Sequence, residues 1–297
     1  MTCVSSDVPT HGNYHNYHGY RYHRPGGYDS RLALLPHDLL TDARVLDVGC
    51  NEGWVSCEIG ASEPPRLLAQ SWGARRVVGV DIDDALVRMA WRRRRTLWSH
   101  QAPFSESSSA SRIKRKRTPL PPKPPVVDYF PASCQHMFGP LPIPPTDTPH
   151  SDTANHKFPH NITFRRADWV NECIPEDEAG YDVIIAFSVS KWIHLNGGDA
   201  GLRRFFERVH ATLVPGGAFV LEAQPRESYT KARKLHPTLQ ENAQTLQLQP
   251  EGFETVLSSM GFRHVQMLGE PGEGRFRRPV DLYIKQVDVL LYYNTDD

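Results

Sequence analysis

The residues best suited to chemistry lie in a turn that follows a short apolar run. Residues 45–48 are mostly apolar, as in a buried strand, and Asp47, Gly49, Asn51 and Gly53 then alternate with other residues. Glycine lets the backbone approach a ligand closely, and a helix beginning after the turn offers N–H groups to that ligand. The spacing differs from the Gly-x-Gly-x-x-Gly pattern of dinucleotide-binding turns. The motif predicts a ligand-binding turn, with an ordinary strand-to-helix turn as the alternative.

A second carboxylate, Asp81, ends the next apolar run, residues 76–80. An acid at the end of this strand can accept hydrogen bonds from both ribose hydroxyls of a nucleoside-containing cofactor. The separation from Gly49 exceeds the usual spacing of about 20 residues. We attribute the excess to an insertion at residues 62–70.

Strands and helices are expected to alternate, which predicts one doubly wound, mostly parallel α/β sheet. We expect strands at 44–48, 76–80, 161–166, 181–187 and 218–222, a closing pair at 263–268 and 280–285, and helices at 31–40, 54–61, 83–95, 199–213 and 250–260. Ligands bind such sheets at the carboxyl ends of the strands. The residues expected at that edge are Asp47, Asn51, Asp81, Asp168 and Phe187.

One internal stretch lacks the pattern of a packed fold. Residues 99–157 are rich in Ser and Pro and contain the basic run 112–117. Because such a composition cannot offset its ordering entropy by apolar burial, we predict a disordered insert within a single domain formed by residues 31–98 and 158–297. The basic run is compatible with nuclear import or with affinity for nucleic acid.

Residues 1–30 are expected to form an N-terminal arm. Its segment 11–31 is dense in Tyr, His, Arg and Gly, which supply aromatic faces and cations for folding over a nucleotide or an RNA. A merely polar terminus is the alternative. A zinc site would need His11, His15, His18 and His23, but no cysteine or carboxylate completes a recognised spacing, so we predict no metal.

The overall composition restricts the class of protein. Lys+Arg and Asp+Glu balance at 34 each, so net charge does not indicate a partner. Five cysteines without a regular framework are typical of free thiols in a reducing compartment. No apolar run approaches the 18 residues of a membrane span. We therefore expect a soluble intracellular protein without a membrane partner.

Several stretches together resemble one family, the RNA 5′-phosphate methyltransferases known as methylphosphate capping enzymes, of the bicoid-interacting type. The stretches that carry the resemblance are residues 12–14, 17–21, 30–32, 46–53, 79–83, 188–196, 221–225, 228–229 and 278–280. The run Ser-Val-Ser-Lys-Trp-Ile-His-Leu-Asn at 188–196 is the most specific, because generic methyltransferases lack it. The turn at 45–55 and the Leu-Val-Pro-Gly-Gly turn at 213–217 also resemble class I methyltransferases that use S-adenosylmethionine (SAM). The resemblance implies their Rossmann-like fold, with an antiparallel C-terminal strand.

The resemblance also implies a SAM site and an acceptor site. The expected cofactor-binding residues are Tyr17, Arg31, Asp47, Gly49, Cys50, Asn51, Asp81, Ile82, Asp168, Trp169 and Phe187. The sequence departs from the family pattern at His18, at Asp168-Trp169, and at Gly197, Ala223 and Arg226. The last three departures affect the acceptor pocket more than the cofactor site.

The chemistry expected of such a site is positioning rather than proton transfer. The sulfonium of SAM already activates the methyl group and a terminal phosphate is already anionic, so the protein must align them and balance the charge. Candidates for catalysis are Tyr20, Arg21, Lys191 and His194, and candidates for contact with RNA are Gln224, Tyr229, Lys231, Arg233, Lys234 and Arg278. A structural position is the alternative for Lys191 and His194, and a solvated face is the alternative for Lys231, Arg233 and Lys234.

The expected function is methyl transfer from SAM to the 5′-terminal γ-phosphate of a small non-coding RNA, such as a small nuclear RNA. We expect a 5′-triphosphate RNA and ribonucleoprotein components as partners, in the nucleus or also in the cytoplasm. The arm would close over the cofactor and the RNA 5′ end. The alternatives are a non-catalytic RNA-binding subunit that stabilises an RNA particle, and a methyltransferase of a small molecule or a protein.

Overall fold

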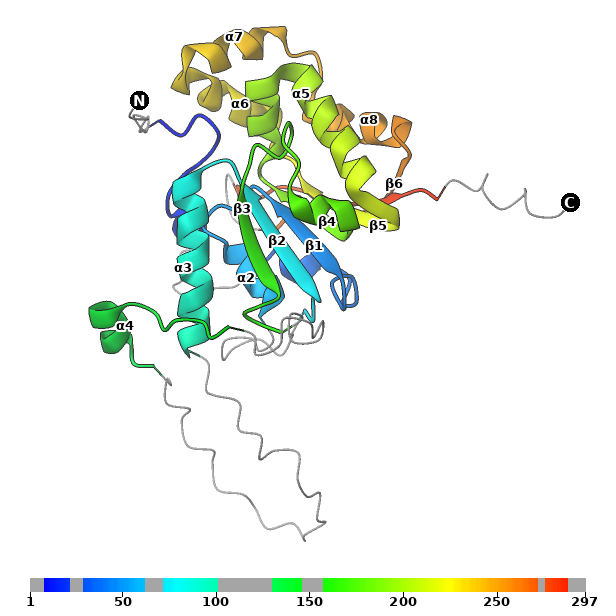
Figure 1. Cartoon of the computed structure of the whole chain (residues 1–297). Helices are drawn as coiled ribbons and strands as arrows, with labels where there is room; N and C mark the ends of the chain where they lie inside the picture. Colours follow the sequence, from blue (N-terminus) through cyan, green and yellow to red (C-terminus); the bar gives the residue numbers. More distant parts are fainter. Residues whose placement is uncertain are drawn as a thin grey trace, which may run out of the picture.

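A single mixed sheet organises the chain, as the computed structural model shows for residues 8–21, 29–61, 72–100, 130–145, 157–271 and 276–287 (Figure 1). Its seven strands follow the order β3-β2-β1-β4-β5-β7-β6. They are β1 (Arg44–Val48), β2 (Arg76–Asp81), β3 (Ile162–Arg166), β4 (Tyr181–Phe187), β5 (Leu213–Glu222), β6 (Phe262–Gly269) and β7 (Val280–Lys285). Strands β1 to β5 pair in parallel, whereas β7 is antiparallel to both β5 and β6. The predicted doubly wound sheet with an antiparallel C-terminal strand is confirmed, and it is the fold of class I methyltransferases.

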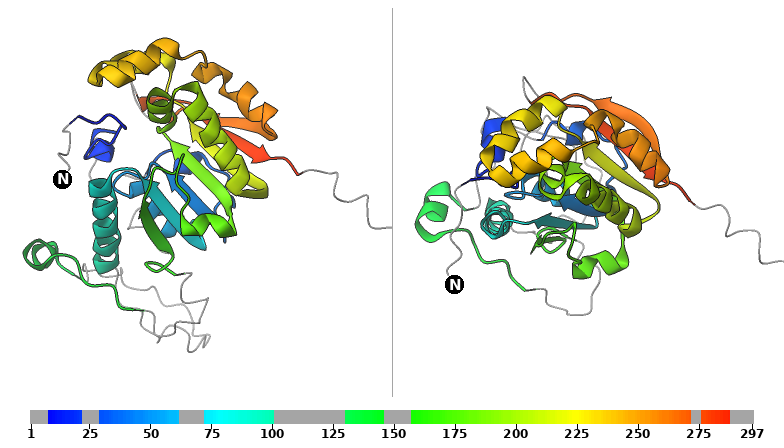
Figure 2. Two further views of the ribbon diagram at one scale, coloured as in Figure 1. Left: turned by 45° about the horizontal axis from the view of Figure 1, so that its top comes forward. Right: turned by 90° about the horizontal axis from the view of Figure 1, so that it is seen from above.

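Helices cover both faces of the sheet (Figure 2). The helical segments are α1 (Tyr17–Arg21), η1 (Leu32–Leu34), α2 (Trp54–Gly60), α3 (Asp84–His100), α4 (Ala132–Phe138), η4 (Pro175–Ala179), α5 (Ser190–Thr212), α6 (Arg226–Ala232), η5 (Arg233–Leu235), α7 (Pro237–Thr245), η6 (Pro250–Gly252) and α8 (Phe253–Ser259). Four elements differ from expectation by five residues or more: α3 extends to His100, β5 begins at Leu213 and includes the turn expected at 213–217, and two helices differ further. The helix expected at 31–40 is only the short turn η1, and α5 begins nine residues before the expected Asp199, with a break in helical geometry at Gly198.

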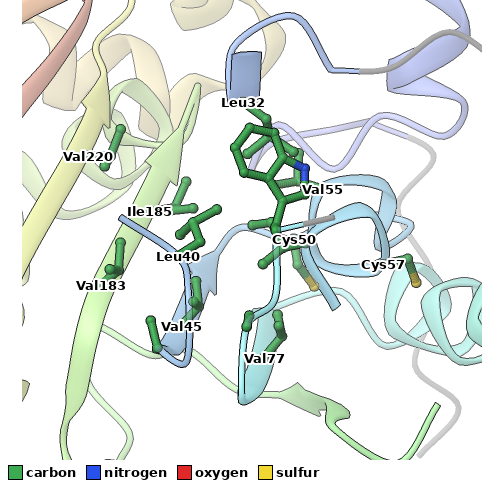
Figure 3. Close-up of a cluster of buried hydrophobic side chains, with 14 of the residues drawn as sticks. Leu32, Leu40, Val45, Cys50, Val55, Cys57, Val77, Val183, Ile185 and Val220 are labelled. Atoms are coloured by element: carbon green, nitrogen blue, oxygen red, sulfur yellow. The ribbon is translucent and has the colours of Figure 1, made fainter. Parts of the chain in front are cut away.

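Alternation along the central strands builds two separate cores. Val45 faces the cluster formed with α2, whereas the adjacent Leu46 faces the cluster formed with α5 and α8. Figure 3 shows the first cluster, where Cys50 and Cys57 pack among aliphatic side chains. Burial raises the pKa of the Cys57 thiol to about 12, so this cysteine packs rather than reacts. Strands buried on both faces explain the nearly continuous apolar runs in the sequence.

The connection from β3 to β4, residues 167–180, is described throughout and contains only η4. Parallel strands are usually joined by a helix that covers one face of the sheet. Helix α5 instead packs over β4 and β5, on the face opposite α2 and α3 (Figure 1). Among the described residues, the short η4 is therefore the only helix over the amino-terminal parts of β1 and β2 on the α5 side.

Part of the segment expected to be disordered is ordered against α3. Gln135 of α4 donates to the Thr96 hydroxyl at 3.0 Å, and its carbonyl oxygen lies 2.7 Å from a ring nitrogen of His100. The N–H of Leu141 also donates to the Ser99 hydroxyl at 2.7 Å. Residues 130–145 thus depart from the expectation of a disordered insert. The basic run 112–117 lies outside the described residues.

Candidate functional site

The turn after β1 has the backbone geometry that a ligand-binding loop needs. Gly49, Asn51 and Gly53 have φ angles of 74°, 51° and 73°, in the left-handed region that favours glycine and tolerates asparagine. A Cβ atom at Gly49 would lie only 2.8 Å from a methyl carbon of Val189, so a larger residue does not fit there. The N–H of Asn51 donates to Asp81 at 2.9 Å, which ties the turn to the end of β2.

The two carboxylates of this region have different positions. Asp47 is buried beneath the turn and accepts a hydrogen bond from the Ser56 hydroxyl at 2.6 Å. Asp81 lies at the surface of a cavity, and backbone N–H groups of Asn51 and Asp83 fix its two oxygens at 2.9 and 3.0 Å. Burial raises the pKa of both carboxyl groups to about 6. Asp47 supports the turn, whereas Asp81 can reach a ligand.

A cavity of about 330 Å³ opens at the carboxyl ends of β1, β2 and β3. Gly49, Asp81, Ile82, Asp168 and Trp169 line it, and all five were predicted cofactor residues. The opposite wall comes from the start of α5. The parallel strand order brings these residues together although Gly49 and Trp169 are 120 positions apart in the sequence.

Trp169 and Cys50 contribute to the site mainly through the core. The Trp169 indole is buried against Phe205, and its N–H donates to Asp177 at 3.1 Å. Cys50 is buried in the α2-side core, and burial raises the pKa of its thiol. Neither side chain is placed chiefly in the cavity, so the predicted stacking of Trp169 on a ligand stays a prediction.

Residues 8–21 of the arm lie against the turn and the cavity. The side-chain amide of Asn13 donates to Asp83 at 2.7 Å, and the amide of Asn51 donates to the Tyr14 carbonyl at 3.0 Å. His11 lines the cavity itself. The described part of the arm therefore forms one wall of the cavity.

The arm also contacts the start of α5. The amide of Asn196 donates to the Thr10 carbonyl at 2.9 Å, and the Tyr14 ring lies edge-on to Trp192, with 5.9 Å between the ring centroids. Gly12 packs so closely on the Trp192 indole that a Cβ atom would lie 2.1 Å from it. These contacts join the two sides of the cavity through the arm.

A buried ionic cluster, which we call the Glu222 cluster, lies at the carboxyl ends of β4 and β5. Its members are Tyr17, Arg21, Asp29, Arg31, Ser188, Glu222 and Arg278. The fully buried carboxylate of Glu222 accepts from Arg21 and from Arg31, each at 2.7 Å, and from the Ser188 hydroxyl. Burial alone would raise the pKa of Glu222, but Arg31 and Arg21 bring it below its ordinary value. Glu222 is thus the ionised counter-charge of the two arginines that the arm supplies.

Ser188 extends the cluster to two further predicted residues. Its hydroxyl accepts from the Tyr17 hydroxyl at 3.1 Å and from Arg278 at 2.8 Å. The Arg31 guanidinium in turn lies 4.2 Å from the centre of the Phe187 ring. The structure therefore brings together Tyr17, Arg31 and Phe187, which were predicted together. Tyr17 and Arg31 belong to the Glu222 cluster and Phe187 lies beside it, and none of the three lines the cavity.

Lys191 and Arg278 form a second, less balanced pair of cations. Burial and, to a smaller extent, the charge of Arg278 together lower the pKa of the Lys191 amine to about 8. The Lys191 amine lies 4.6 Å from the centre of the Trp192 ring. The Nε–H of Arg278 is buried and has no hydrogen-bond acceptor among the described residues. Because the positive charge of Arg278 disfavours protonation of Lys191, an anionic ligand beside both side chains would be favoured.

His194 lies inside the layer of helices rather than at the cavity. It is fully buried, and its ring nitrogens lie 2.7 Å from the Asp199 carboxylate and 3.3 Å from the Tyr229 hydroxyl. Burial lowers the pKa of His194, although Asp199 opposes that effect. Because both nitrogens are engaged, this histidine and Tyr229 occupy structural positions in this arrangement.

The remaining predicted residues surround the same edge of the sheet. The Gln224 side chain accepts from the Ser190 hydroxyl at 3.2 Å and from the Lys191 N–H at 3.1 Å, which fixes the start of α5. Lys231 and Lys234 are exposed and Arg233 is half-buried. The side chain of Tyr20, within α1, and residue His23 lie outside what the structure describes.

Sequence reasoning missed Glu222 and Ser188. The signal for Glu222 was available, because it ends an apolar strand in the same way as Asp81. Its partners could not be found, since Arg21 and Arg31 lie 201 and 191 positions away in the sequence. Within the described ranges, no group of three or more His, Cys, Asp or Glu side chains is arranged to hold a metal ion. Nor does any described helix combine the length and apolarity of a membrane span.

Comparison with known proteins identifies related chains. The sequence model described as Bicoid-interacting protein 3 (Bin3) matches residues 181–285. The 7SK snRNA methylphosphate capping enzyme of Mus musculus is 35% identical over 93% of this chain and 40% of its own length. The U6 snRNA methylphosphate capping enzyme Amus of Drosophila melanogaster is 28% identical over 93% of this chain and 74% of its own. This chain thus spans about two fifths of the mouse relative.

A plant relative aligns over most of both chains. A probable RNA methyltransferase of Arabidopsis thaliana is 31% identical over 89% of this chain and 76% of its own length. Together with the matched sequence model, this similarity shows that the chain belongs to the bicoid-interacting protein 3 (Bin3) family.

Proposed function

We propose that this chain is a SAM-dependent RNA methyltransferase that methylates the γ-phosphate at the 5′ end of a small non-coding RNA. The observation that carries the proposal is one continuous site, in which the arm joins the cavity beside Asp81 to the cations around Ser188. The printed names of the mouse and Drosophila relatives, which are snRNA methylphosphate capping enzymes, support the RNA substrate.

The cavity suits SAM. Gly49 lines the cavity, and the oriented carboxylate of Asp81 can accept the ribose hydroxyls. Asp168, at the rim beyond β3, can accept from the amino group of the adenine. SAM supplies a methyl group that its sulfonium has already activated. Asp47 and Cys50 act through the turn, and Tyr17, Arg31 and Phe187 support the arm that borders the cavity.

The acceptor phosphate is best placed beside Lys191 and Arg278. Both residues are only 8% exposed. Among the described residues, no carboxylate oxygen lies within ion-pair distance of either side chain. A terminal phosphate oxygen is already a nucleophile near neutral pH, so the cations align it and spread its charge without removing a proton. Arg21, whose charge is balanced by Glu222, holds the arm beside these cations.

The other predicted residues take supporting roles in this proposal. Gln224, His194 and Tyr229 position the start of α5, which carries Lys191. Lys231, Arg233 and Lys234 border the acceptor side and contact the RNA beyond its first nucleotide, and Tyr20 donates to a phosphate. The arm acts as a lid, and ribonucleoprotein components are the expected partners in the nucleus.

The direct test is transfer of label from methyl-labelled SAM to RNA. The full chain should label a 5′-triphosphate RNA but not the same RNA with a 5′ hydroxyl, and the label should resist a phosphomonoesterase but be released by a pyrophosphatase that cleaves the 5′ anhydride bonds. Label in internal nucleotides would contradict the proposed acceptor. RNA binding without any transfer would favour the non-catalytic RNA-binding subunit instead.

The cofactor side is tested by Asp81→Asn, which keeps the size of the side chain and removes its charge. We expect SAM affinity to fall because a charge-assisted hydrogen bond is worth about 1.5–3 kcal/mol. Isothermal calorimetry gives the affinity, and Asp84→Asn, at the exposed neighbour that pairs with Arg88, is the matched control. Unchanged affinity for SAM would remove Asp81 from the site.

A further inference from the structure

A second cavity opens at the opposite end of the sheet, where the strands begin. It has a volume of about 340 Å³ and lies on the face that the β3-to-β4 connection covers only with η4. Arg44, Arg76 and Arg165 line it together with Glu176 of η4. Three arginines against one glutamate leave a surplus of two positive charges in the lining. We call it the basal cavity.

The three arginines differ in how far their charge is balanced. Arg165 is neutralised, because its guanidinium pairs with both oxygens of Glu176 at 2.7–3.2 Å. Arg44 donates only to backbone carbonyls of η4, those of Ala179 and Glu176, so its charge is held in place but not cancelled there. The Arg76 side chain is exposed and makes no hydrogen bond or ion pair within the described residues.

The crowding of cations at this end extends beyond the lining. Burial lowers the pKa of the Arg44 guanidinium, and the positive charge of neighbouring Arg75 lowers it further. The carboxylate of Asp182 opposes that effect, but it already accepts from the Arg44 N–H at 2.7 Å and lies 4.0 Å from Arg75. The amino ends of neighbouring strands therefore carry cations that repel one another, and a bound anion would relieve that repulsion.

We propose that the basal cavity binds a backbone phosphate of the RNA. This phosphate lies beyond the 5′ end, which enters the site at the carboxyl ends of the strands. The proposal rests on the proposed function in taking RNA as the ligand. A phosphate matches the planar donors of Arg44 and Arg76, which can approach one oxygen each. The strands separate the two sites by roughly 15–20 Å at about 3.3 Å per residue, a span that an RNA chain can cross over the protein surface.

The test compares Arg76→Gln with a matched control in direct RNA binding. Arg76 makes no side-chain contact whose loss could unfold the protein, and Arg263→Gln removes an equally exposed arginine from the far edge strand β6. Fluorescence anisotropy would be measured with a long 5′-triphosphate RNA and with its first few nucleotides alone, over a series of salt concentrations.

For the long RNA we expect Arg76→Gln to weaken binding several-fold, and the slope of log K against log salt to become shallower by about 0.7–0.9, the value for one lost phosphate contact. The short RNA should bind Arg76→Gln and the unaltered protein alike, and Arg263→Gln should change neither. Inorganic phosphate should compete with the long RNA but not with the short one, because it would occupy the basal cavity in place of the backbone phosphate.

Three results would overturn the proposal: unchanged binding of the long RNA to Arg76→Gln, an equal loss for the short RNA, or an equal loss in Arg263→Gln. Because binding is measured without SAM, the result is independent of methyl transfer. A chain that transfers no methyl group but loses long-RNA affinity with Arg76→Gln would refute the proposed function and leave the basal cavity as an RNA site.

Discussion

The two ends of the sheet use arginine in opposite ways. At the carboxyl ends, Arg21 and Arg31 are buried and paired with the fully buried Glu222. At the amino ends, Arg44 and Arg76 border a cavity without a carboxylate of their own in the described structure. A buried cation needs a counter-charge, whereas an exposed one keeps its hydration and stays available. The first arrangement fixes geometry, and the second supplies charge to a ligand.

Among the variants that test this comparison, Glu222→Gln is expected to have the largest effect on stability. The substitution keeps the shape of the side chain but removes the carboxylate that pairs with Arg21 in a buried place, and it leaves Arg31 with Asp29 alone. Breaking a buried pair in this way typically costs about 3–5 kcal/mol. Denaturant unfolding should show a loss of that order, and the arm should lose its protection in hydrogen exchange.

The matched control is Glu207→Gln, because Glu207 is an exposed carboxylate on α5. A Glu222→Gln variant with the stability and arm protection of the control would mean that the Glu222 cluster does not fix the arm. Partial recovery in Glu222→Asp, which restores the charge with a shorter side chain, would support the ionic role over a purely steric one.

An intermediate effect concerns the pH dependence of RNA binding. The Lys191 amine has a pKa of about 8, so it carries its charge below that pH and loses it above. Affinity for 5′-triphosphate RNA should therefore fall between pH 7 and pH 9, by at most about tenfold, because each pH unit above the pKa lowers the protonated fraction about tenfold. Filter binding at constant salt measures this change.

In the variant Lys191→Arg the charge persists throughout this range, so its affinity should be independent of pH. The same decline in that variant would assign the titration to another group. A phosphate beside Lys191 would itself raise the pKa of the amine, so the decline with SAM and RNA bound should move to higher pH.

The smallest effect on stability is expected at the amino ends of the strands, from Arg76→Gln. Arg76→Gln should change the free energy of unfolding by no more than about 0.5 kcal/mol, as expected for an exposed side chain without partners. Urea unfolding of this variant beside Glu222→Gln would separate a cation used for a ligand from cations used for the fold. A large loss in Arg76→Gln would mean that the basal cavity contributes to stability.

Most of the fold could be predicted from the sequence because its signals are local. Apolar runs and glycine turns gave the parallel strands, and the acid that ends β2 gave one residue of the cavity lining. The expected strands at 44–48 and 181–187 match β1 and β4. The doubly wound order then follows from general rules of connection.

The parts that could not be predicted depend on contacts between distant residues. Whether His194 faces a ligand or Asp199 is decided by how α5 bends at Gly198, which no periodicity reports. The docking of α4 on α3 depends on a few hydrogen bonds from Gln135 within a segment whose composition predicts disorder. Local patterns contain no information on such pairings.

The backbone conformation of Ser188 is unfavourable for a residue that carries a side chain. Its φ angle of 60° lies in the left-handed region, where a residue other than glycine is strained by about 1–3 kcal/mol. Glycine would relax that strain, but it would also remove the hydroxyl that Tyr17, Arg278 and Glu222 share. Folding and positioning therefore favour different residues at this position. Selection for stability alone would replace Ser188, so it is a place where thermostability and activity are expected to trade against each other.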